Sequence, residues 1–337
     1  MIAIPASSVF SAAAGFVLVL ALTPLLRAAA KSIGLLDRPN ARSSHAAIVP
    51  RGGGVAIALS VLGAFAIVHS GPLSQALPVL LGALALAVVG LSDDRLSLPA
   101  GVRVAAQAAV AIAVVTTLGG LERFPLPPPL DWPLGPLGAP LAAFWIVMVV
   151  NFFNFLDGID GLAAFQAAIT ASGVVIAAWD PSLALLAGAL AGAAAGFLPF
   201  NWSPASIFLG DAGSYFLGFT LAALPLAAPP DLRSSAVLFV SLSLWLFLAD
   251  ATFTLARRAL RGERLHQAHR EHLYQQLARR FGHARVTLSI GLASAMLTAF
   301  SLLALGTRSQ AWLWAALGLA VAAFAVEAVT ASYQGSA

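Results

Sequence analysis

The chain has 337 residues, of which 60% are hydrophobic and only 9% are charged, and its mean hydropathy is +0.90. A soluble domain carries roughly 25% charged residues, so this composition excludes a soluble protein and predicts an integral membrane protein. Because the chain has no cysteine, structural disulfides, thiolate metal sites and thiol nucleophiles are excluded. The net charge of +4 would suit nucleic acid, but in a membrane chain basic loops set the orientation first, and no nucleic-acid partner is expected.

Eleven apolar runs are long enough to cross a bilayer, so we predict an all-α, polytopic membrane bundle that forms one domain over residues 1–337. The runs lie at about 9–30, 53–69, 75–91, 101–119, 138–156, 161–179, 182–199, 213–228, 235–255, 286–305 and 311–329. The first has no small-residue cleavage site behind a short apolar core, and it is predicted to remain as a span. Several runs are rich in Ala and Gly, which permits close helix packing.

The charged residues favour one orientation. If the N-terminus lies outside, 15 of the 18 basic residues fall in cytoplasmic loops. The acidic residues at the ends of the spans fall on that same side. We therefore predict a periplasmic N-terminus, a cytoplasmic C-terminus and an active site on the cytoplasmic face. The loops that would form this site are 31–54, 92–100, 151–161, 200–214 and 256–285.

The Pro-Arg-Gly-Gly-Gly loop at 50–54 opens the second span. Its backbone N–H groups and Arg51 could bind an anion, or the loop could simply be tight and flexible. Asp93 and Asp94 end the third span. Adjacent carboxylates repel each other, so one is protonated or shared with a metal, unless the pair only caps a loop beside Arg95.

The most informative stretch is 151–162, Asn-Phe-Phe-Asn-Phe-Leu-Asp-Gly-Ile-Asp-Gly-Leu. Ionisable groups at membrane depth are costly and usually mark a functional site. Gly158 and Gly161 predict that the helix ends near Asp157 and that Asp160 lies on a turn beside it. Two amides and two carboxylates in one corner suit a hard cation and the phosphates it carries. The alternative is a polar patch that packs one helix against another.

Two later segments carry further polar residues. In Phe-Leu-Gly-Asp-Ala-Gly-Ser at 208–214, Asp211 either caps the next helix or binds a metal at its start. In the segment 262–275, the spacing predicts that the histidines and Arg270 share one helical face. We interpret this face as a cationic cradle for phosphates, in preference to a zinc site or a solvated basic loop. His283 is expected to belong to the same basic loop, with no special role.

Together these motifs place five aspartates, two arginines and several histidines at one predicted cytoplasmic surface. The five aspartates are Asp93, Asp94, Asp157, Asp160 and Asp211. An acidic cluster would repel an anionic substrate unless a divalent cation bridges them, and Mg²⁺ is held by one or two carboxylates with water and substrate phosphates. This pattern predicts phosphoryl transfer, and the membrane location implies that one reactant is a lipid.

In this order, the motifs resemble those of the polyprenyl-phosphate N-acetylhexosamine-1-phosphate transferases of glycosyltransferase family 4, and the resemblance covers nearly the whole chain. It implies a multi-helix bundle in the bacterial inner membrane. Such enzymes transfer a sugar-1-phosphate from a UDP-N-acetyl-amino-sugar to undecaprenyl phosphate and release UMP. They do so with Mg²⁺, for which Mn²⁺ could substitute. The protein could form a homodimer, and the sequence leaves its oligomeric state open.

The resemblance also implies residue roles. Asp211 and Asn154 look like metal ligands, and Asp93, Asp94 and Asp157 look like catalytic residues. The nucleotide would meet Asp160 and Asn201. The diphosphate and amino sugar would meet His269, Arg270 and His272. The lipid phosphate would meet His45 and Arg51.

The last motif, His-Arg-Glu-His-Leu-Tyr-Gln at 269–275, lacks the adjacent His-His pair of the members that use UDP-N-acetylglucosamine or the muramyl-pentapeptide donor. It is more similar to the O-antigen-initiating members, some of which use 6-deoxy-N-acetyl sugars, which argues against the peptidoglycan enzyme and leaves the sugar open. Two other classes of membrane protein are alternatives to this family. An intramembrane prenyltransferase should have two similar aspartate-rich clusters, and a transporter should have charges near the midplane and repeated halves. The chain shows neither pattern.

Overall fold

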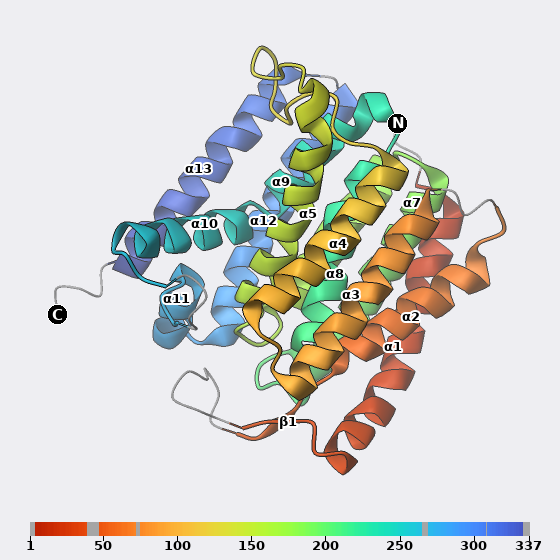
Figure 1. Cartoon of the computed structure of the whole chain (residues 1–337), viewed down its shortest axis with the longest axis vertical. Helices are drawn as coiled ribbons and strands as arrows, with labels where there is room; N and C mark the ends of the chain where they lie inside the picture. Colours follow the sequence, from red (N-terminus) through yellow and green to blue (C-terminus); the bar gives the residue numbers. More distant parts are fainter. Residues whose placement is uncertain (1–3, 39–46, 72–74, 265–268, 308, 333–337) are drawn as a thin grey trace.

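The computed structural model describes residues 4–38, 47–71, 75–264, 269–307 and 309–332. In these residues the chain is a bundle of helices with one short hairpin (Figure 1). The α-helices are α1 (Ala6–Ser32), α2 (Gly53–Val68), α3 (Ala76–Leu96), α4 (Ala100–Leu118), α5 (Gly138–Leu156), α6 (Leu162–Ala177), α7 (Pro181–Asn201), α8 (Gly210–Ala223), α9 (Arg233–Ser243), α10 (Trp245–Leu260), α11 (Leu273–Phe281), α12 (His283–Thr307) and α13 (Gln310–Ser332). Short 3-10 turns lie at Gly135–Leu137, Leu224–Ala227 and Pro230–Leu232. The hairpin pairs β1 (Leu36–Asp37) with β2 (Val49–Pro50) in antiparallel register, Leu36 opposite Pro50.

The described residues contain seven helices that are long and apolar enough to cross a membrane. The number rises to eight if α8 and α9, which form a pair bent by 116°, are taken as one span. α2 and α6 are apolar but have only 16 residues each. The all-helical, multi-pass membrane architecture is therefore confirmed, whereas the count of eleven spans stays a prediction.

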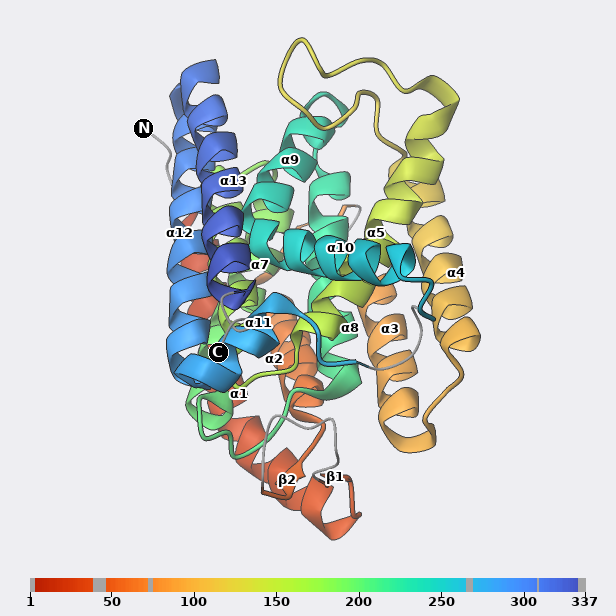
Figure 2. The same ribbon diagram turned by 90° about the vertical axis from the view of Figure 1, so that its left-hand side faces the viewer.

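The predicted span at 235–255 is wrong as a single helix. It is divided at Leu244 into α9 and α10, and α10 runs across the long axis of the bundle in both views (Figures 1 and 2). The side-chain amide of Gln166 donates a hydrogen bond to the carbonyl of Ser243 at 2.8 Å. A side chain that inserts into the backbone ladder in this way is a known cause of sharp helix bends.

Close packing of α1 against α7 depends on small residues, as the Ala- and Gly-rich runs predict. Gly188, Gly192 and Gly196 recur every four residues on α7 and therefore share one face. A Cβ atom added at Gly192 would lie 1.9 Å from the carbonyl oxygen of Ala12 on α1. In lipid, association between helices comes from such close contacts, because the bilayer offers no hydrophobic driving force between them.

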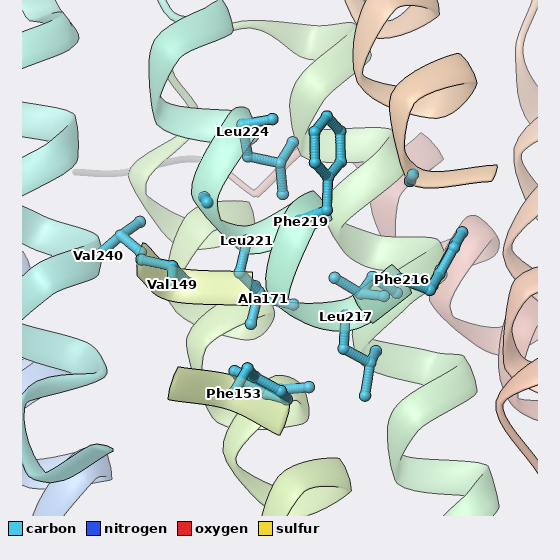
Figure 3. Close-up of a cluster of buried hydrophobic side chains, with 14 of the residues drawn as sticks. Val149, Phe153, Ala171, Phe216, Leu217, Phe219, Leu221, Leu224 and Val240 are labelled. Atoms are coloured by element: carbon cyan, nitrogen blue, oxygen red, sulfur yellow. The ribbon is translucent and has the colours of Figure 1, made fainter. Parts of the chain in front are cut away.

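α8 runs through the centre of the bundle, and every residue from Ala212 to Ala223 is buried. Its side chains pack against those of α5, α6 and α9, with Phe153 and Phe216 among the largest that are fully buried (Figure 3). This packing fixes the position of the first turn of α8, which carries Asp211.

The polar ends of several helices meet at one end of the bundle. The β1–β2 hairpin, the end of α3 and the start of α8 lie at the lower end in Figure 1, with α11 to one side. The loop between α4 and α5 lies at the opposite end (Figure 2). The candidate active site lies at this lower end.

Candidate active site

The first turn of α8 is capped by a carboxylate from another helix. Asp94, on α3, accepts hydrogen bonds from the backbone N–H groups of Asp211 at 3.1 Å and Ala212 at 3.2 Å. A negative charge at a helix N-terminus is favourable, because the first N–H groups have no partner within the helix. Of the two roles open to Asp211, capping this helix therefore falls to Asp94, and the carboxylate of Asp211 is left for another role.

Asp211 is held from the side by α5. The side-chain nitrogen of Asn154 donates to Oδ1 of Asp211 at 2.7 Å and to the hydroxyl of Ser214 at 2.9 Å. These two bonds use the amide nitrogen of Asn154, so its oxygen is the atom available to a cation. The structure thus brings the two predicted metal ligands, Asp211 and Asn154, into direct contact.

Asp157 follows the last residue of α5, and Asp160 lies on the turn before α6, as the sequence predicts. Asp157 is only partly exposed. Burial, and then the neighbouring charges of Asp211 and Asp94, raise the pKa of Asp157 well above its ordinary value. Carboxylates from three helix ends therefore repel one another at this end of the bundle.

Asp93 points to a different set of partners from its neighbour Asp94. It accepts hydrogen bonds from the backbone N–H of Leu98 at 2.8 Å, from Arg103 at 2.9 Å and from the hydroxyl of Tyr215 at 3.3 Å. The contact with Tyr215 places Asp93 against α8, one turn beyond Asp211. Its partners on three segments hold it in place.

The glycine loop at 52–54 serves packing, which decides between the two readings of that motif. The N–H groups of Gly53 and Gly54 donate to the carbonyls of Phe208 and Leu209 at 2.9 and 2.8 Å, so they are not presented to an anion. A Cβ atom on Gly54 would lie 2.0 Å from the Cα of Gly213, so only glycine lets α2 approach α8 this closely.

Arg51 does reach the acidic cluster. It forms an ion pair with Asp37 of the hairpin at 2.9 Å and lies 3.8 Å from Asp94. Burial opposes the charge of Arg51, but Asp37, Asp94 and Asp211 outweigh it and raise its pKa. The other residue predicted for the lipid phosphate, His45, lies outside the described residues.

Asp160 and Asn201 form a second group, on the side of α12. Asp160 accepts from the backbone N–H of Ala205 at 3.2 Å and pairs with His283 at 3.4 Å. Burial works against the charge of Asp160, but the hydrogen bond and charge of His283 outweigh it and lower its pKa. Asn201 is buried, and its side chain binds the backbone of Gly161 and Ile207. Asn201, one of the two residues predicted to bind the nucleotide, thus has a structural role, because its side chain bonds to the backbone of the protein.

His283, for which no special role is expected, lies at the start of α12 and pairs with Asp160 at 3.4 Å. The expectation of one helical face over His269, Arg270 and His272 is wrong. These residues precede α11 and are not helical.

The segment 269–272 nevertheless lies beside the acidic cluster. The hydroxyl of Tyr274 donates to the carbonyl of Phe155 at 2.9 Å, which holds α11 against the end of α5. The rings of His269 and His272 are 4.9 Å apart. Arg270 and His269 are partly exposed, whereas His272 is only 3% exposed. The fourth cationic residue of the motif, His266, lies outside the described residues.

The donor set suits Mg²⁺ only together with substrate. In the part of the chain that the structure describes, no three His, Cys, Asp or Glu side chains are arranged to hold a metal ion by themselves. Mg²⁺ prefers oxygen ligands, and it commonly takes one or two carboxylates and completes its shell with phosphates. The oxygens of Asp211 and Asn154, with the carboxylate of Asp157 nearby, fit that mode of binding.

The fold and the site define a multi-pass membrane protein in which carboxylates from several helix ends gather at one end of the bundle. The sequence profile of Glycosyl transferase family 4 matches residues 76–228, which include Asp93, Asp94, the 151–162 stretch and Asp211.

Several curated proteins are similar over most of the chain. The "Probable undecaprenyl-phosphate N-acetylglucosaminyl 1-phosphate transferase" of Bacillus subtilis is 33% identical over 273 residues, which cover 77% of this chain and 74% of that protein. The "Undecaprenyl-phosphate alpha-N-acetylglucosaminyl 1-phosphate transferase" of Escherichia coli K12 is 29% identical over 292 residues, 82% of this chain and 78% of that protein. The "Decaprenyl-phosphate N-acetylglucosaminephosphotransferase" of Mycobacterium tuberculosis H37Rv is 30% identical over 310 residues, which cover 79% of this chain and 75% of that protein. The chain belongs to glycosyl transferase family 4, the family that its motifs resemble.

Proposed function

We propose that the protein transfers an N-acetylhexosamine-1-phosphate from a UDP-sugar to undecaprenyl phosphate and releases UMP. The observation that carries this proposal is the meeting of Asp94, Asp157 and Asp211 at the first turn of α8, with Arg51 beside them. This arrangement suits a cation that carries phosphates. The names of the relatives, which act on polyprenyl phosphates, support the lipid acceptor.

In the proposed reaction, an oxygen of the lipid phosphate attacks the sugar-proximal phosphorus in line with the departing UMP. A new P–O bond forms to the lipid phosphate, and the bond from that phosphorus to the bridging oxygen breaks. A phosphate monoester has a second pKa of about 6, so the acceptor is largely dianionic at neutral pH and does not require a strong base. A two-step route through an aspartyl-phosphate is the alternative, and it predicts a labelled enzyme intermediate with UDP-sugar alone.

The proposed roles of the residues are those that the family resemblance implies. Mg²⁺, held by Asp211 and Asn154 together with the donor's phosphates, would supply charge neutralisation at the diphosphate. We propose that Arg51 binds the lipid phosphate, and its position between Asp37 and Asp94 supports this role. We propose that Asp160 meets the nucleotide and that the segment 269–272 meets the diphosphate and sugar, as the family resemblance implies.

UDP-N-acetylglucosamine is the first donor to test, because all three relatives carry N-acetylglucosamine in their names. A 6-deoxy-N-acetyl donor is the second, because the motif at 269–275 lacks the adjacent His-His pair. With either sugar, we propose that the product starts an O-antigen or other envelope polysaccharide at the bacterial inner membrane.

The test is UMP release from purified protein with undecaprenyl phosphate, Mg²⁺ and a panel of UDP-sugars. We expect release that needs both the lipid phosphate and the divalent cation, that stops with EDTA and that recovers with excess Mg²⁺ or Mn²⁺. Release of UMP would also separate this reaction from prenyl transfer and from transport. An intact, folded preparation that binds no UDP-sugar and releases no UMP would contradict the proposal.

A further inference from the structure

Asp250 accepts four hydrogen bonds from the described residues, yet none of the motifs above contains it. It lies on α10 and is fully buried. Its Oδ1 accepts from the hydroxyl of Thr254 at 3.0 Å, from Nδ1 of His272 at 3.1 Å and from the N–H of Leu273 at 3.0 Å. Its Oδ2 accepts from the N–H of Tyr274 at 3.0 Å.

These bonds make Asp250 the N-terminal cap of α11, supplied from a different helix. Leu273 and Tyr274 are the first two residues of α11, whose N–H groups have no acceptor within the helix. His272, the residue that precedes them, makes no side-chain cap of its own. The start of α11 therefore depends on α10 for its position.

The same carboxylate orients His272. Because an ionised carboxylate only accepts hydrogen bonds, the imidazole must carry a hydrogen on Nδ1. A carboxylate behind an imidazole fixes both its tautomer and its ring plane. The ring of His269 then lies 4.9 Å from that of His272, and His269 is the more exposed of the two.

We propose that Asp250 is a positioning residue for the UDP-sugar: through His272 and the first turn of α11, it holds the segment 269–272 in the shape that presents His269 and Arg270 to the donor. This inference rests on the proposed function for its choice of substrate. It also changes the role of His272, which acts from behind His269 and, being buried, does not contact the sugar itself.

The variant that tests the proposal is Asp250→Asn. It keeps the volume and one oxygen, but its NH₂ group cannot accept the hydrogen bond from the N–H of Tyr274. Glu327→Gln is the matched control, because Glu327 is another buried carboxyl near Asp250, on α13, and its oxygens accept no hydrogen bond from the described residues. Both changes convert a buried acid to its amide in the same region.

Two measurements decide the question. Hydrogen exchange read by mass spectrometry should show the peptide that begins α11 exchanging about tenfold faster or more in Asp250→Asn, as loss of a bond to a charged acceptor implies, and unchanged in Glu327→Gln. In the UMP-release assay, Asp250→Asn should raise the KM for the UDP-sugar about 10-fold to 100-fold, by analogy with the loss that follows when the partner orienting a metal-binding imidazole is removed. The KM for undecaprenyl phosphate should not change.

A merely structural role would give a different result. In that case kcat would fall because less protein is active, and both KM values would stay as in the wild type, which would overturn the proposal. Wild-type exchange in Asp250→Asn would overturn it as well. If the wild-type enzyme released no UMP with any donor, the proposed function would fail, while the exchange comparison would still decide whether Asp250 holds this segment.

Discussion

The carboxylate of Asp94 accepts a hydrogen bond from the backbone N–H of Asp211 at 3.1 Å, although the two residues are 117 positions apart in the chain. This bond ties the end of α3 to the start of α8. It places a negative charge at a helix N-terminus, where it is favourable, and it sets where the side chain of Asp211 can lie. The two aspartates thus form one structural unit, in which Asp94 caps the start of α8 and Asn154 donates a hydrogen bond to Asp211.

We expect Asp211→Ala to remove divalent-cation-dependent turnover, because it deletes the carboxylate that Asn154 orients. UMP release at saturating Mg²⁺ and Mn²⁺ measures this effect, and the loss should be at least about 100-fold, as for other groups that stabilise developing charge. Asp131→Ala is the control, since Asp131 pairs with Arg123 in the loop at the opposite end. Full activity in Asp211→Ala would contradict the proposal that Asp211 is a metal ligand.

We expect Asp93→Asn to reduce turnover by less than about 100-fold and not to abolish it. A positioned general base contributes about 100-fold to 10,000-fold, and a dianionic acceptor does not require one. Asn can still accept one of the bonds that Leu98 and Arg103 donate to Asp93. Steady-state kinetics from pH 5 to 9 measure the effect. A larger loss would indicate that Asp93 is an obligatory base.

Gly54→Ala should destabilise the protein by at least about 1–3 kcal/mol, the usual penalty for overpacking, because the new Cβ would lie 2.0 Å from the Cα of Gly213. Thermal unfolding in detergent measures this change. Gly101→Ala, near the start of α4, has no heavy atom within 4 Å of its new Cβ and should change stability by less than about 1 kcal/mol. Equal stability of the two variants would mean that α2 and α8 are not in close contact.

Asp157→Asn should stabilise the metal-free protein at neutral pH. Because burial and the charges of Asp211 and Asp94 raise its folded pKa, the contribution of Asp157 to stability is fully present below its unfolded pKa of about 3.9 and is lost as pH rises through the folded value. The amide in the variant stays neutral, so the variant does not lose this stability as pH rises. The free energy of unfolding of the variant, relative to wild type, should therefore increase from acid to neutral pH in EDTA.

Asp157→Asn should also lower turnover. The charge of Asp157 destabilises the empty site, and a bound cation would offset this repulsion, as is common for residues kept for activity at a cost in stability. Denaturant unfolding at pH 4 and pH 7.5, with and without Mg²⁺, separates the two effects. A variant no more stable than wild type at pH 7.5 would contradict the raised pKa of Asp157.

The sequence alone allowed much of the fold and part of the site to be predicted. Apolar runs of spanning length predicted the membrane bundle, because a helix in lipid must satisfy its own backbone and present apolar side chains all round. Gly158 and Gly161 correctly predicted the end of α5 and the turn that carries Asp160. The predicted span at 235–255 failed because Gln166, far away in the chain, takes the carbonyl of Ser243 and ends α9.

The sequence by itself determined the class of protein and the residue types available for phosphate chemistry. It also determined that the polar residues gather at one end of the helix bundle. Only the tertiary structure decided which of those residues bond to one another and which of them cap a helix. Asp94 and Asp250 read as equivalent acids in a string of letters, yet each caps a helix that another part of the chain supplies. Such partnerships depend on how helices cross in space, and local periodicity carries no information about that.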